Sequence, residues 1–285
     1  MKKGIPCSLV LRSVALALVC LMLISACTSL ETPNKVAPAA EARPGRLPGY
    51  LPANALPNSL ALLPPPPAAG STAFSLDEEI YRKTRALRDT PRWGLAAEDA
   101  EMAFPHAAGA FSCALNAPIT EEDTPHLYLL MRRTLRDAGL STYAAKNQYR
   151  RTRPFIVNKE TSCTPDWENR MMTDGSYPSG HAAFGWAWAL ILCEIDPEHT
   201  DAILARGLAF GQSRVICGVH WQSDVIGGCL VGAGTVARLH ADPAFRADVE
   251  AAKAELTAVR AKGLKPTRDC KAEAEALAQQ PPAAP

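Results

Sequence analysis

Three short segments of the chain carry side chains that can bind a phosphoryl group and transfer it. The first holds Lys146 and Arg153, the second is the quartet Pro-Ser-Gly-His at 178–181, and the third, 213–224, holds one arginine, one histidine and one aspartate. Cationic side chains bind phosphate oxygens, and an imidazole oriented by a carboxylate can attack phosphorus. The combination predicts phosphoryl transfer in which three fixed cations stabilise the reacting group, with no metal or other cofactor.

The third segment pairs a nucleophile with the group that orients it. His220 and Asp224 are four residues apart at the start of an apolar run, so on a helix they would share one face. The carboxylate can then hold one imidazole nitrogen as a donor and leave the other free to attack. Arg214 completes the set, because a guanidinium binds two phosphate oxygens at once and stays protonated. Taken alone, such a pair is also typical of an ordinary surface contact.

The second segment predicts an anion site at a helix start. Ser179 and Gly180 directly precede an apolar stretch, 182–193, that is typical of a helix. Backbone N–H groups at such a start attract anions, and the Ser179 hydroxyl adds a donor. His181 lies beside this site, where it can protonate a leaving oxygen. A Pro-Ser-Gly turn before a helix is common, and a lone histidine there is equally typical of a cap or of the core.

The first segment supplies two more cations. Lys146 and Arg153 are seven residues apart, which corresponds to two helical turns, and Pro154 is expected to end the helix that carries both. Both side chains would then point into the same cavity. A basic run such as 146–153 is more often a solvated helix face. The functional interpretation therefore rests on the joint occurrence of all three segments in a fixed order.

The three patterns K-x6-R-P, P-S-G-H and S-R-x5-H-x3-D together resemble the signature of the phosphatidic acid phosphatase type 2 superfamily. The longer strings GSYPSGH at 175–181 and GQSRVICGVHWQSD at 211–224 resemble, more specifically, the class A bacterial nonspecific acid phosphatases. The resemblance covers roughly residues 63–257. Further matching strings are LPPPPAAG at 63–70, PRW at 91–93, AAEDAE at 96–101, DAG at 137–139 and RTRPF at 151–155.

The resemblance implies an all-α helical bundle of the phosphatidic acid phosphatase type 2 and haloperoxidase type, and an exported acid phosphatase that acts on small phosphomonoesters. It implies that His220, held by Asp224, attacks phosphorus to form a phosphohistidine, and that His181 protonates the leaving alcohol and then activates water. Ala182 stands where the family usually has threonine, and the missing hydroxyl bears on hydrogen bonding and substrate preference. The implied phosphate-binding groups are Lys146, Arg153, Ser179, Gly180 and Arg214.

Three other functions compete with this one. A vanadium haloperoxidase uses nearly the same constellation to bind vanadate, so the short motifs alone also fit an oxidoreductase. A membrane-embedded lipid phosphatase would need several spans of about 20 residues, and the sequence offers none after its leader. A non-catalytic phosphate-binding lipoprotein would need neither the His220–Asp224 pair nor His181.

The N-terminus predicts export and a lipid anchor. Basic residues precede an apolar stretch, 13–26, whose fourteen residues fit a signal peptide and are too few for an ordinary membrane span. The stretch ends in Leu-Ile-Ser-Ala-Cys, which resembles a bacterial lipobox with Cys27 as the lipidated residue. Thr28 rather than aspartate follows the cysteine, which by analogy with enteric lipoproteins favours sorting to the outer membrane. We therefore expect a periplasmic protein that contacts that membrane only through lipidated Cys27. The alternative is a soluble secreted protein cleaved near Ala26.

The chain is expected to divide into four parts: a signal peptide at 1–26, a Pro- and Ala-rich tether at 27–70, a phosphatase domain at 71–262 and a disordered tail at 263–285. Removal of the leader, which holds three basic residues, changes the formal net charge from +1 to −2. This charge excludes a nucleic-acid-binding surface. A homo-oligomer is compatible with the sequence.

Apolar periodicity within the domain predicts helices and no alternating strand. The first helix should begin at Ser75, whose hydroxyl would form a capping box with Glu78. The segments 181–195 and 220–240 are apolar nearly all round and should form the two central helices, with four glycines in the latter allowing a close approach. The predicted helices are 75–89, 95–115, 121–138, 140–153, 181–195, 198–216, 220–240 and 242–262.

Six cysteines lie outside the leader and the lipobox, enough for up to three disulfides in an oxidising compartment. Cys193, Cys217 and Cys229 fall in apolar helical stretches, which predicts buried thiols at these positions. The chain has no Cys-x-x-Cys pair and no spacing of histidine and cysteine that is typical of zinc, so no metal site is expected.

Overall fold

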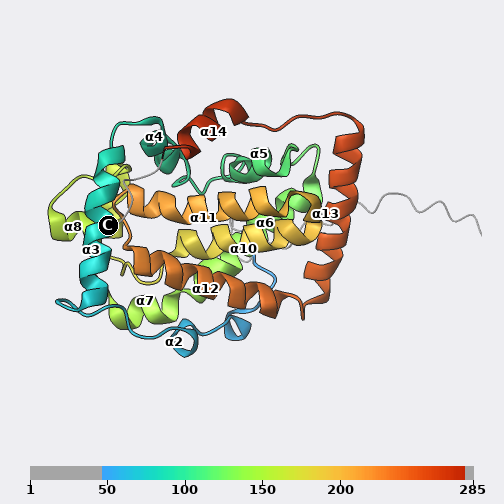
Figure 1. The fold of residues 1–285 in the computed structure, drawn as a ribbon. Coiled ribbons are helices and arrows are strands. Elements are labelled where there is room, and N and C mark those ends of the chain that lie inside the picture. Colours follow the sequence, from blue (N-terminus) through green and yellow to red (C-terminus); the bar gives the residue numbers. More distant parts are fainter. Residues whose placement is uncertain (1–46, 280–285) are drawn as a thin grey trace, which may run out of the picture. The chain divides into compact units, whose positions relative to one another are not determined.

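The computed structural model describes residues 47–279, so the predicted signal peptide, Cys27 and residues 280–285 lie outside the described part. Within it the chain forms α-helices and short 3-10 helices without a strand, which confirms the all-α prediction (Figure 1). No helix of this part is both long and apolar enough to span a membrane. The α-helices are α2 (Ser59–Leu62), α3 (Thr72–Thr84), α4 (Pro91–Glu98), α5 (Ser112–Leu115), α6 (Pro125–Ser141), α7 (Tyr143–Tyr149), α8 (Pro154–Asn158), α9 (Glu168–Met171), α10 (Gly180–Ile195), α11 (Thr200–Ile216), α12 (Gln222–Leu239), α13 (Pro243–Ala261) and α14 (Cys270–Leu277).

Helix α10 forms the centre of the core, where it packs against α12, α11 and α6 (Figure 1). The contact with α12 is close because a Cβ on Gly228 would lie 2.4 Å from the backbone oxygen of Ser179, and one on Gly232 would lie 2.3 Å from that of Ala183. Ser179 also donates its N–H to the Asp224 carbonyl at 2.9 Å, so α10 and α12 begin at the same place. The prediction that these two helices are central is confirmed.

Two helix boundaries near the N-terminal side of the domain differ from expectation. Helix α3 begins one turn early, with the Ser71 hydroxyl accepting the N–H of Phe74, so the predicted capping box at Ser75 is wrong. The predicted helix 95–115 is also wrong. Helix α4 ends at Glu98, and the chain forms only the 3-10 helix η3 (Ala107–Phe111) and the short α5 before residue 116. Pro105 interrupts the apolar pattern, because proline lacks the N–H that a helix interior needs.

Lys146 and Arg153 do not share a helix as predicted. Helix α7 ends at Tyr149, where Arg150 takes a left-handed backbone with φ of 43°. Pro154 begins α8 instead of ending the helix before it. A residue that precedes proline avoids helical backbone, and Arg153 is accordingly extended.

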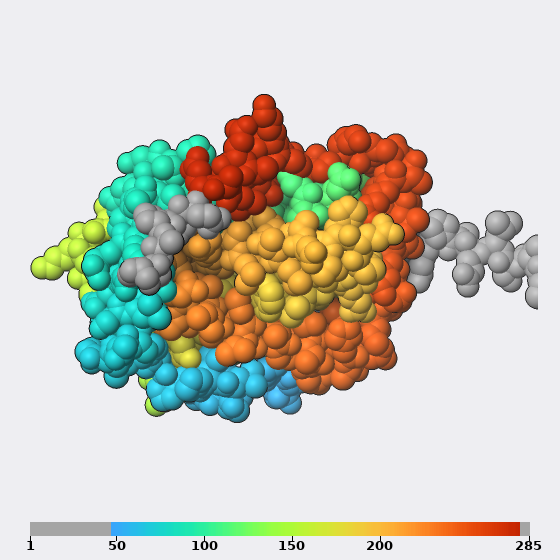
Figure 2. Space-filling model, in the orientation of Figure 1, coloured from blue at the N-terminus to red at the C-terminus, as the bar shows by residue number. Residues whose placement is uncertain are grey.

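The end of the predicted tether is part of the domain. The N–H groups of Tyr50 and Leu51 donate to the Asp137 carboxylate at 2.8 and 3.1 Å, and the Tyr50 hydroxyl donates to Asp248. Leu63 is buried as well. In the space-filling view the segment that leads into α2, in blue, covers an edge of the domain beside α12, in orange (Figure 2). The expectation of a tether up to residue 70 is therefore wrong for this stretch, because apolar side chains here find a partner surface.

The expectation of a disordered tail from residue 263 is wrong for the described residues up to 279. Helix α14, in red, packs against α4 (Figure 2). A disulfide joins Cys270 to Cys113. A second disulfide joins Cys163 to Cys217, so the predicted thiol at Cys217 is wrong. Cys193 and Cys229 are free thiols as predicted, but they are only partly buried, so the predicted full burial is wrong. Cys217 is the C-cap of α11, and its carbonyl accepts the N–H of Cys163, which brings the two sulfurs together.

Candidate active site

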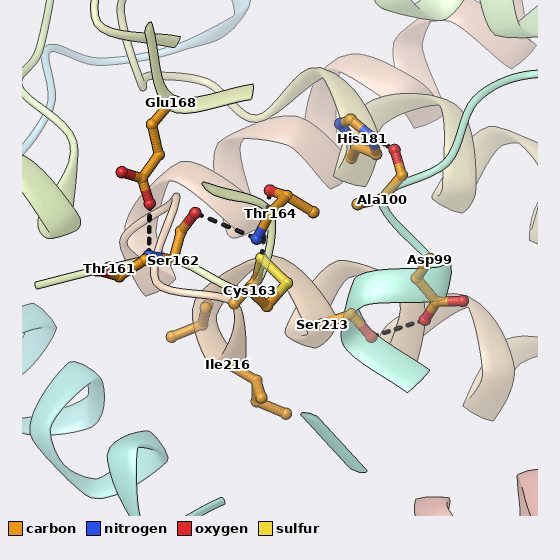
Figure 3. Close-up of a disulfide and its surroundings, with 12 residues drawn as sticks. Asp99, Ala100, Thr161, Ser162, Cys163, Thr164, Glu168, His181, Ser213 and Ile216 are labelled. Atoms are coloured by element: carbon orange, nitrogen blue, oxygen red, sulfur yellow. Dashed lines mark hydrogen bonds between the residues drawn. A yellow bond between two sulfur atoms is a disulfide. The ribbon is translucent and has the colours of Figure 1, made fainter. Parts of the chain in front are cut away.

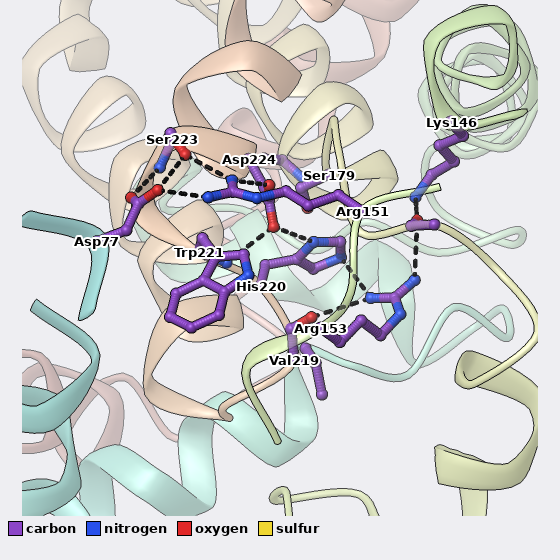
Figure 4. A network of polar contacts seen from close by, with 12 residues as sticks. Asp77, Lys146, Arg151, Arg153, Ser179, Val219, His220, Trp221, Ser223 and Asp224 are labelled. Atoms are coloured by element: carbon purple, nitrogen blue, oxygen red, sulfur yellow. Dashed lines mark hydrogen bonds and ion pairs between the residues drawn. The ribbon is translucent and has the colours of Figure 1, made fainter. Parts of the chain in front are cut away.

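His220 and Asp224 contact each other at the start of α12 (Figure 4). The helix begins at Gln222, so His220 precedes it, and the expectation that both residues lie on the helix is wrong. The pair still meets, with His220 Nδ1 at 3.4 Å from Asp224 Oδ2. The other ring nitrogen, Nε2, lies 3.2 Å from Nη1 of Arg153. Because a guanidinium only donates, Nε2 is the acceptor and the ring proton is on Nδ1, facing Asp224.

The Asp224 carboxylate is fully buried and has a donor on each oxygen. Oδ2 accepts the N–H of Trp221 at 2.8 Å, and Oδ1 accepts Nη1 of Arg151 at 2.6 Å. Burial raises the pKa of Asp224, and Arg151 opposes that rise. Burial and the nearby cations, Arg153 foremost, hold the pKa of His220 well below its ordinary value. The lowered pKa favours the neutral imidazole, whose Nε2 keeps its lone pair.

Lys146 and Arg153 lie together although different segments carry them. Lys146 Nζ donates to the Gly175 carbonyl at 2.7 Å, and Arg153 Nη2 donates to the same oxygen at 3.4 Å (Figure 4). Arg153 Nη1 also donates to the Val219 carbonyl at 3.0 Å. Asp174, which is partly exposed, is their nearest carboxylate, at 3.8 Å from Lys146 Nζ and 3.6 Å from Arg153 Nη2. Backbone carbonyls therefore hold both cations beside the ring of His220.

Arg214, in the last turn of α11, is 2% exposed, and its Nε and Nη1 have no hydrogen-bond partner among residues 47–279. Burial together with Arg153 lowers the pKa of Arg214 to about 10 and that of Lys146 to about 8. Buried charges normally need a partner. Among the described residues, the ion pairs of these three buried cations are those of Lys146 and Arg153 with the partly exposed Asp174, so the cluster suits a bound anion.

The start of α10 adds donors to the same site. Ser179 is the N-cap, where its hydroxyl oxygen accepts the N–H of Ala182 at 3.2 Å, which leaves the hydroxyl hydrogen to donate elsewhere. Gly180 is the first residue of the helix, so its N–H has no acceptor within α10. The described residues, 47–279, contain no group of three or more His, Cys, Asp or Glu side chains arranged to hold a metal ion.

His181 lies in the first turn of α10 with one ring nitrogen committed to the backbone (Figure 3). Its Nε2 lies 3.1 Å from the Ala100 carbonyl, which can only accept, so Nε2 carries a proton and Nδ1 is the free nitrogen. The ring packs against Phe184 and Phe210. Burial, with Arg214 as the next cause, holds the pKa of His181 well below its ordinary value.

A buried polar network next to Ala100 was not predicted from the sequence. Asp99 accepts from both terminal nitrogens of Arg206 and from the Ser213 hydroxyl, the latter at 2.7 Å (Figure 3). Arg92 also donates to Ser213 at 3.0 Å. The only sequence feature that drew attention to Asp99 is the family-like string AAEDAE that contains it. Nothing in the sequence indicates that it pairs with Arg206.

A second network that the sequence did not predict contacts Asp224 through Oδ1, the oxygen that does not face His220 (Figure 4). Arg151 joins the Asp224 carboxylate to that of Asp77, which its Nη2 contacts at 2.8 Å. Ser223 donates its N–H and its hydroxyl to Asp77 at 2.9 and 2.5 Å. Arg151 was visible only as part of the string RTRPF, and Asp77 gave no signal.

Comparison with known proteins is consistent with this geometry. The model of the PAP2 superfamily matches residues 127–247. The chain is 48% identical over 204 residues to a non-specific acid phosphatase of Providencia stuartii, an alignment that covers 71% of this chain and 82% of that protein. It is 44% identical over 200 residues to a non-specific acid phosphatase of Salmonella typhi, covering 70% and 80% of the two chains. An acid phosphatase of Zymomonas mobilis is 40% identical over 201 residues, with 70% and 76% covered.

Proposed function

Because the chain belongs to the class A bacterial non-specific acid phosphatases of the PAP2 superfamily, we propose that it hydrolyses small phosphomonoesters through a phosphohistidine on His220, without a metal. That it is an acid phosphatase follows from the family, and the route is the proposed part. The observation that supports this route best is the gathering of Lys146, Arg153 and Arg214 around a neutral imidazole whose Nε2 carries a lone pair.

In the first step the phosphate of the substrate binds among the three cations, the Ser179 hydroxyl and the Gly180 N–H. Arg153 Nη1, which donates to Nε2 without substrate, turns to a phosphate oxygen and frees the lone pair. Nε2 then forms a bond to phosphorus as the bond to the leaving oxygen breaks. The Nδ1 proton stays on His220, where Asp224 balances the positive charge that the ring acquires.

His181 carries the proton that the leaving oxygen needs. Its Nε2–H is committed to Ala100, so Nδ1 is the nitrogen that gains a proton when a negatively charged phosphate binds nearby. Nδ1 donates this proton to the leaving oxygen and, in the second step, accepts one from the water that attacks phosphorus. The bond between phosphorus and Nε2 then breaks, which returns His220 to its starting state.

We also propose that the protein is exported and anchored to the outer membrane by lipidated Cys27. The support is the N-terminal sequence alone: a short apolar stretch that ends in Leu-Ile-Ser-Ala-Cys. The residues concerned lie outside the described part of the chain.

Two assays on the purified protein test the proposed reaction. Phosphate release from an aryl phosphate should continue at the same rate after treatment with a chelator, because protein cations hold the phosphate. Bromide oxidation by peroxide in the presence of vanadate should be absent. Loss of hydrolysis on chelation would contradict the metal-free route, and steady bromide oxidation would favour the haloperoxidase alternative.

A further inference from the structure

Asp224 has two partners whose demands on its carboxylate conflict, His220 and Arg151. Its Oδ2 faces His220 Nδ1 and should hold that proton firmly, yet its Oδ1 accepts from the charged guanidinium of Arg151 at 2.6 Å. A cation at this distance attracts the carboxylate charge and weakens the acceptor that faces the histidine. Without compensation, Arg151 would fix the position of Asp224 while making it a poorer partner for His220.

Asp77 supplies the compensation. Its carboxylate, 3% exposed, lies 2.8 Å from Arg151 Nη2, on the side of the guanidinium away from Asp224. Ser223 fixes both groups, since its hydroxyl accepts from Arg151 at 2.7 Å and donates to Asp77. The guanidinium also lies over the ring of Trp221, with its carbon 5.5 Å from the ring centroid. Arg151 is thus held in one orientation between two buried carboxylates.

We propose that Asp77 is a positioning residue for the nucleophile: it neutralises and orients Arg151, so that Asp224 keeps its charge for the Nδ1 proton of His220. The proposal rests on the proposed function of His220. Its consequence falls on the phosphorylation step, in which the bond from Nε2 to phosphorus forms, the bond to the leaving oxygen breaks and Nδ1 retains its proton. Asp77 contacts none of the three phosphate-binding cations, so binding of phosphate should not depend on it.

The decisive variant is Asp77→Asn. The amide keeps an oxygen for the Ser223 N–H and replaces the charged Oδ2, which accepts from Arg151 and from the Ser223 hydroxyl, with a neutral NH2 group. Glu78→Gln is the matched control, since it removes one negative charge from the next residue of α3. We expect Asp77→Asn to lower kcat about tenfold or more, with KM and the inhibition constant of inorganic phosphate nearly unchanged. The control should leave all three constants unchanged.

A double variant tests whether Asp77 acts through Arg151. Arg151→Gln alone should lower kcat, because Asp224 loses its orienting donor. In Arg151→Gln there is no guanidinium charge for Asp77 to neutralise. The double variant with Asp77→Asn should therefore be as active as Arg151→Gln alone. Losses that multiply would overturn the proposal, as would an Asp77→Asn variant with normal kcat.

A spectroscopic measurement separates positioning from a merely structural role. In protein labelled with ¹⁵N-histidine, His220 should appear with a protonated Nδ1 and a bare Nε2, and Asp77→Asn should raise the population with the proton on Nε2. A folded Asp77→Asn variant with the wild-type spectrum contradicts the proposal. If instead His220→Ala retains activity, the phosphohistidine route itself is wrong, whatever Asp77 does.

Discussion

The pKa shifts of the site groups share one largest cause, which is the burial of the cations and imidazoles. Lys146, Arg214, His181 and His220 all have lowered pKa values for which burial is the largest cause. The protonated form of each group would be stabilised by a negative charge nearby. A bound phosphate would supply that charge, so the site is electrostatically prepared for its substrate.

Lys146 should limit phosphate binding at alkaline pH. Its pKa of about 8 means that the ammonium loses its proton as pH rises through that value, and phosphate binding should weaken there. Arginine stays charged throughout this range. We therefore expect kcat/KM of the wild type to fall above pH 8, and Lys146→Arg to be less active at low pH but free of this decline.

The control for this prediction is Lys159→Arg, at an exposed position. Its pH profile should match the wild type. If kcat/KM of Lys146→Arg still declines above pH 8, the decline is due to the titration of another group.

His181 should matter most when the leaving group is poor. We expect His181→Ala to reduce turnover of alkyl phosphates, such as sugar or nucleotide esters, by about 10²-fold or more, because general acid catalysis contributes on that scale. Phosphorylation by an activated aryl phosphate should suffer less, and the aryl substrate should give a burst of phenol followed by slow phosphate release. Rapid-quench kinetics measure both. Equal losses for the two substrates, without a burst, would make His181 a structural residue.

At the residue scale, spacing within the motifs named the eight candidate residues of the three segments. The structure places Asp224 and Arg153 in contact with His220, whereas the supporting residues Asp77 and Asp99 were missed. Asp77 lies 74 residues from Arg151 in the sequence, and Asp99 lies 107 residues from Arg206. Such pairs form only because the fold brings distant helices together, and no local pattern encodes them.

At the scale of secondary structure, the site depends on where helices begin. The first residues of α10 bind the anion in the proposed function, and the chain just before α12 carries the nucleophile. The hydrogen bond from the Ser179 N–H to the Asp224 carbonyl holds these two starts together. The close contact of α10 and α12 therefore determines the distance between phosphate donors and nucleophile.

Gly232 makes this contact testable. A methyl group there would meet the Ala183 backbone oxygen, which cannot move without shifting α10, so Gly232→Ala should lower the free energy of unfolding by about 1–3 kcal/mol. Gly234→Ala is the matched control, because its methyl meets only the flexible end of Leu62. That variant should be neutral or more stable by up to about 1 kcal/mol, from helix propensity. Urea denaturation measures both, and equal effects would show that the contact is not tight.

Helices with continuous apolar faces were predicted nearly to the residue, and those near prolines were not. The segment 181–195 became α10 (Gly180–Ile195), because its apolar run has no competing signal. Around Pro105 and Pro154 the same periodicity continued through residues that cannot stay helical. The short helices α8 and α9 escaped notice because five and four residues are too few to show a helical apolar period.

At the scale of the whole molecule, both ends of the described chain are fastened to the domain. Tyr50 and Leu51 are bound by Asp137, and the C-terminal α14 is bound by the disulfide between Cys113 and Cys270. Composition suggested flexible segments at both ends because prolines and alanines dominate there. Composition does not reveal the few buried side chains and the disulfide that fix such segments.

Cys27 is the test of location. We expect Cys27→Ser to release the protein from the membrane fraction, or to leave it unprocessed, because the thiol that receives the lipid is gone. The isolated domain should hydrolyse phosphomonoesters at an unchanged rate, since none of the site residues lies near this position in the sequence. A wild-type protein found free of membranes after export would contradict the anchor.

The central claim is that the phosphoryl group passes through His220, and trapping the intermediate tests it most directly. An aryl phosphate should be mixed with enzyme, quenched in alkali within the first turnover and analysed by mass spectrometry of the peptides. We predict one phosphoryl group on the peptide that contains His220, none in His220→Ala, and no turnover by that variant despite an intact helical circular dichroism spectrum. Phosphoryl transfer to another residue, or substantial turnover by His220→Ala, would contradict the account.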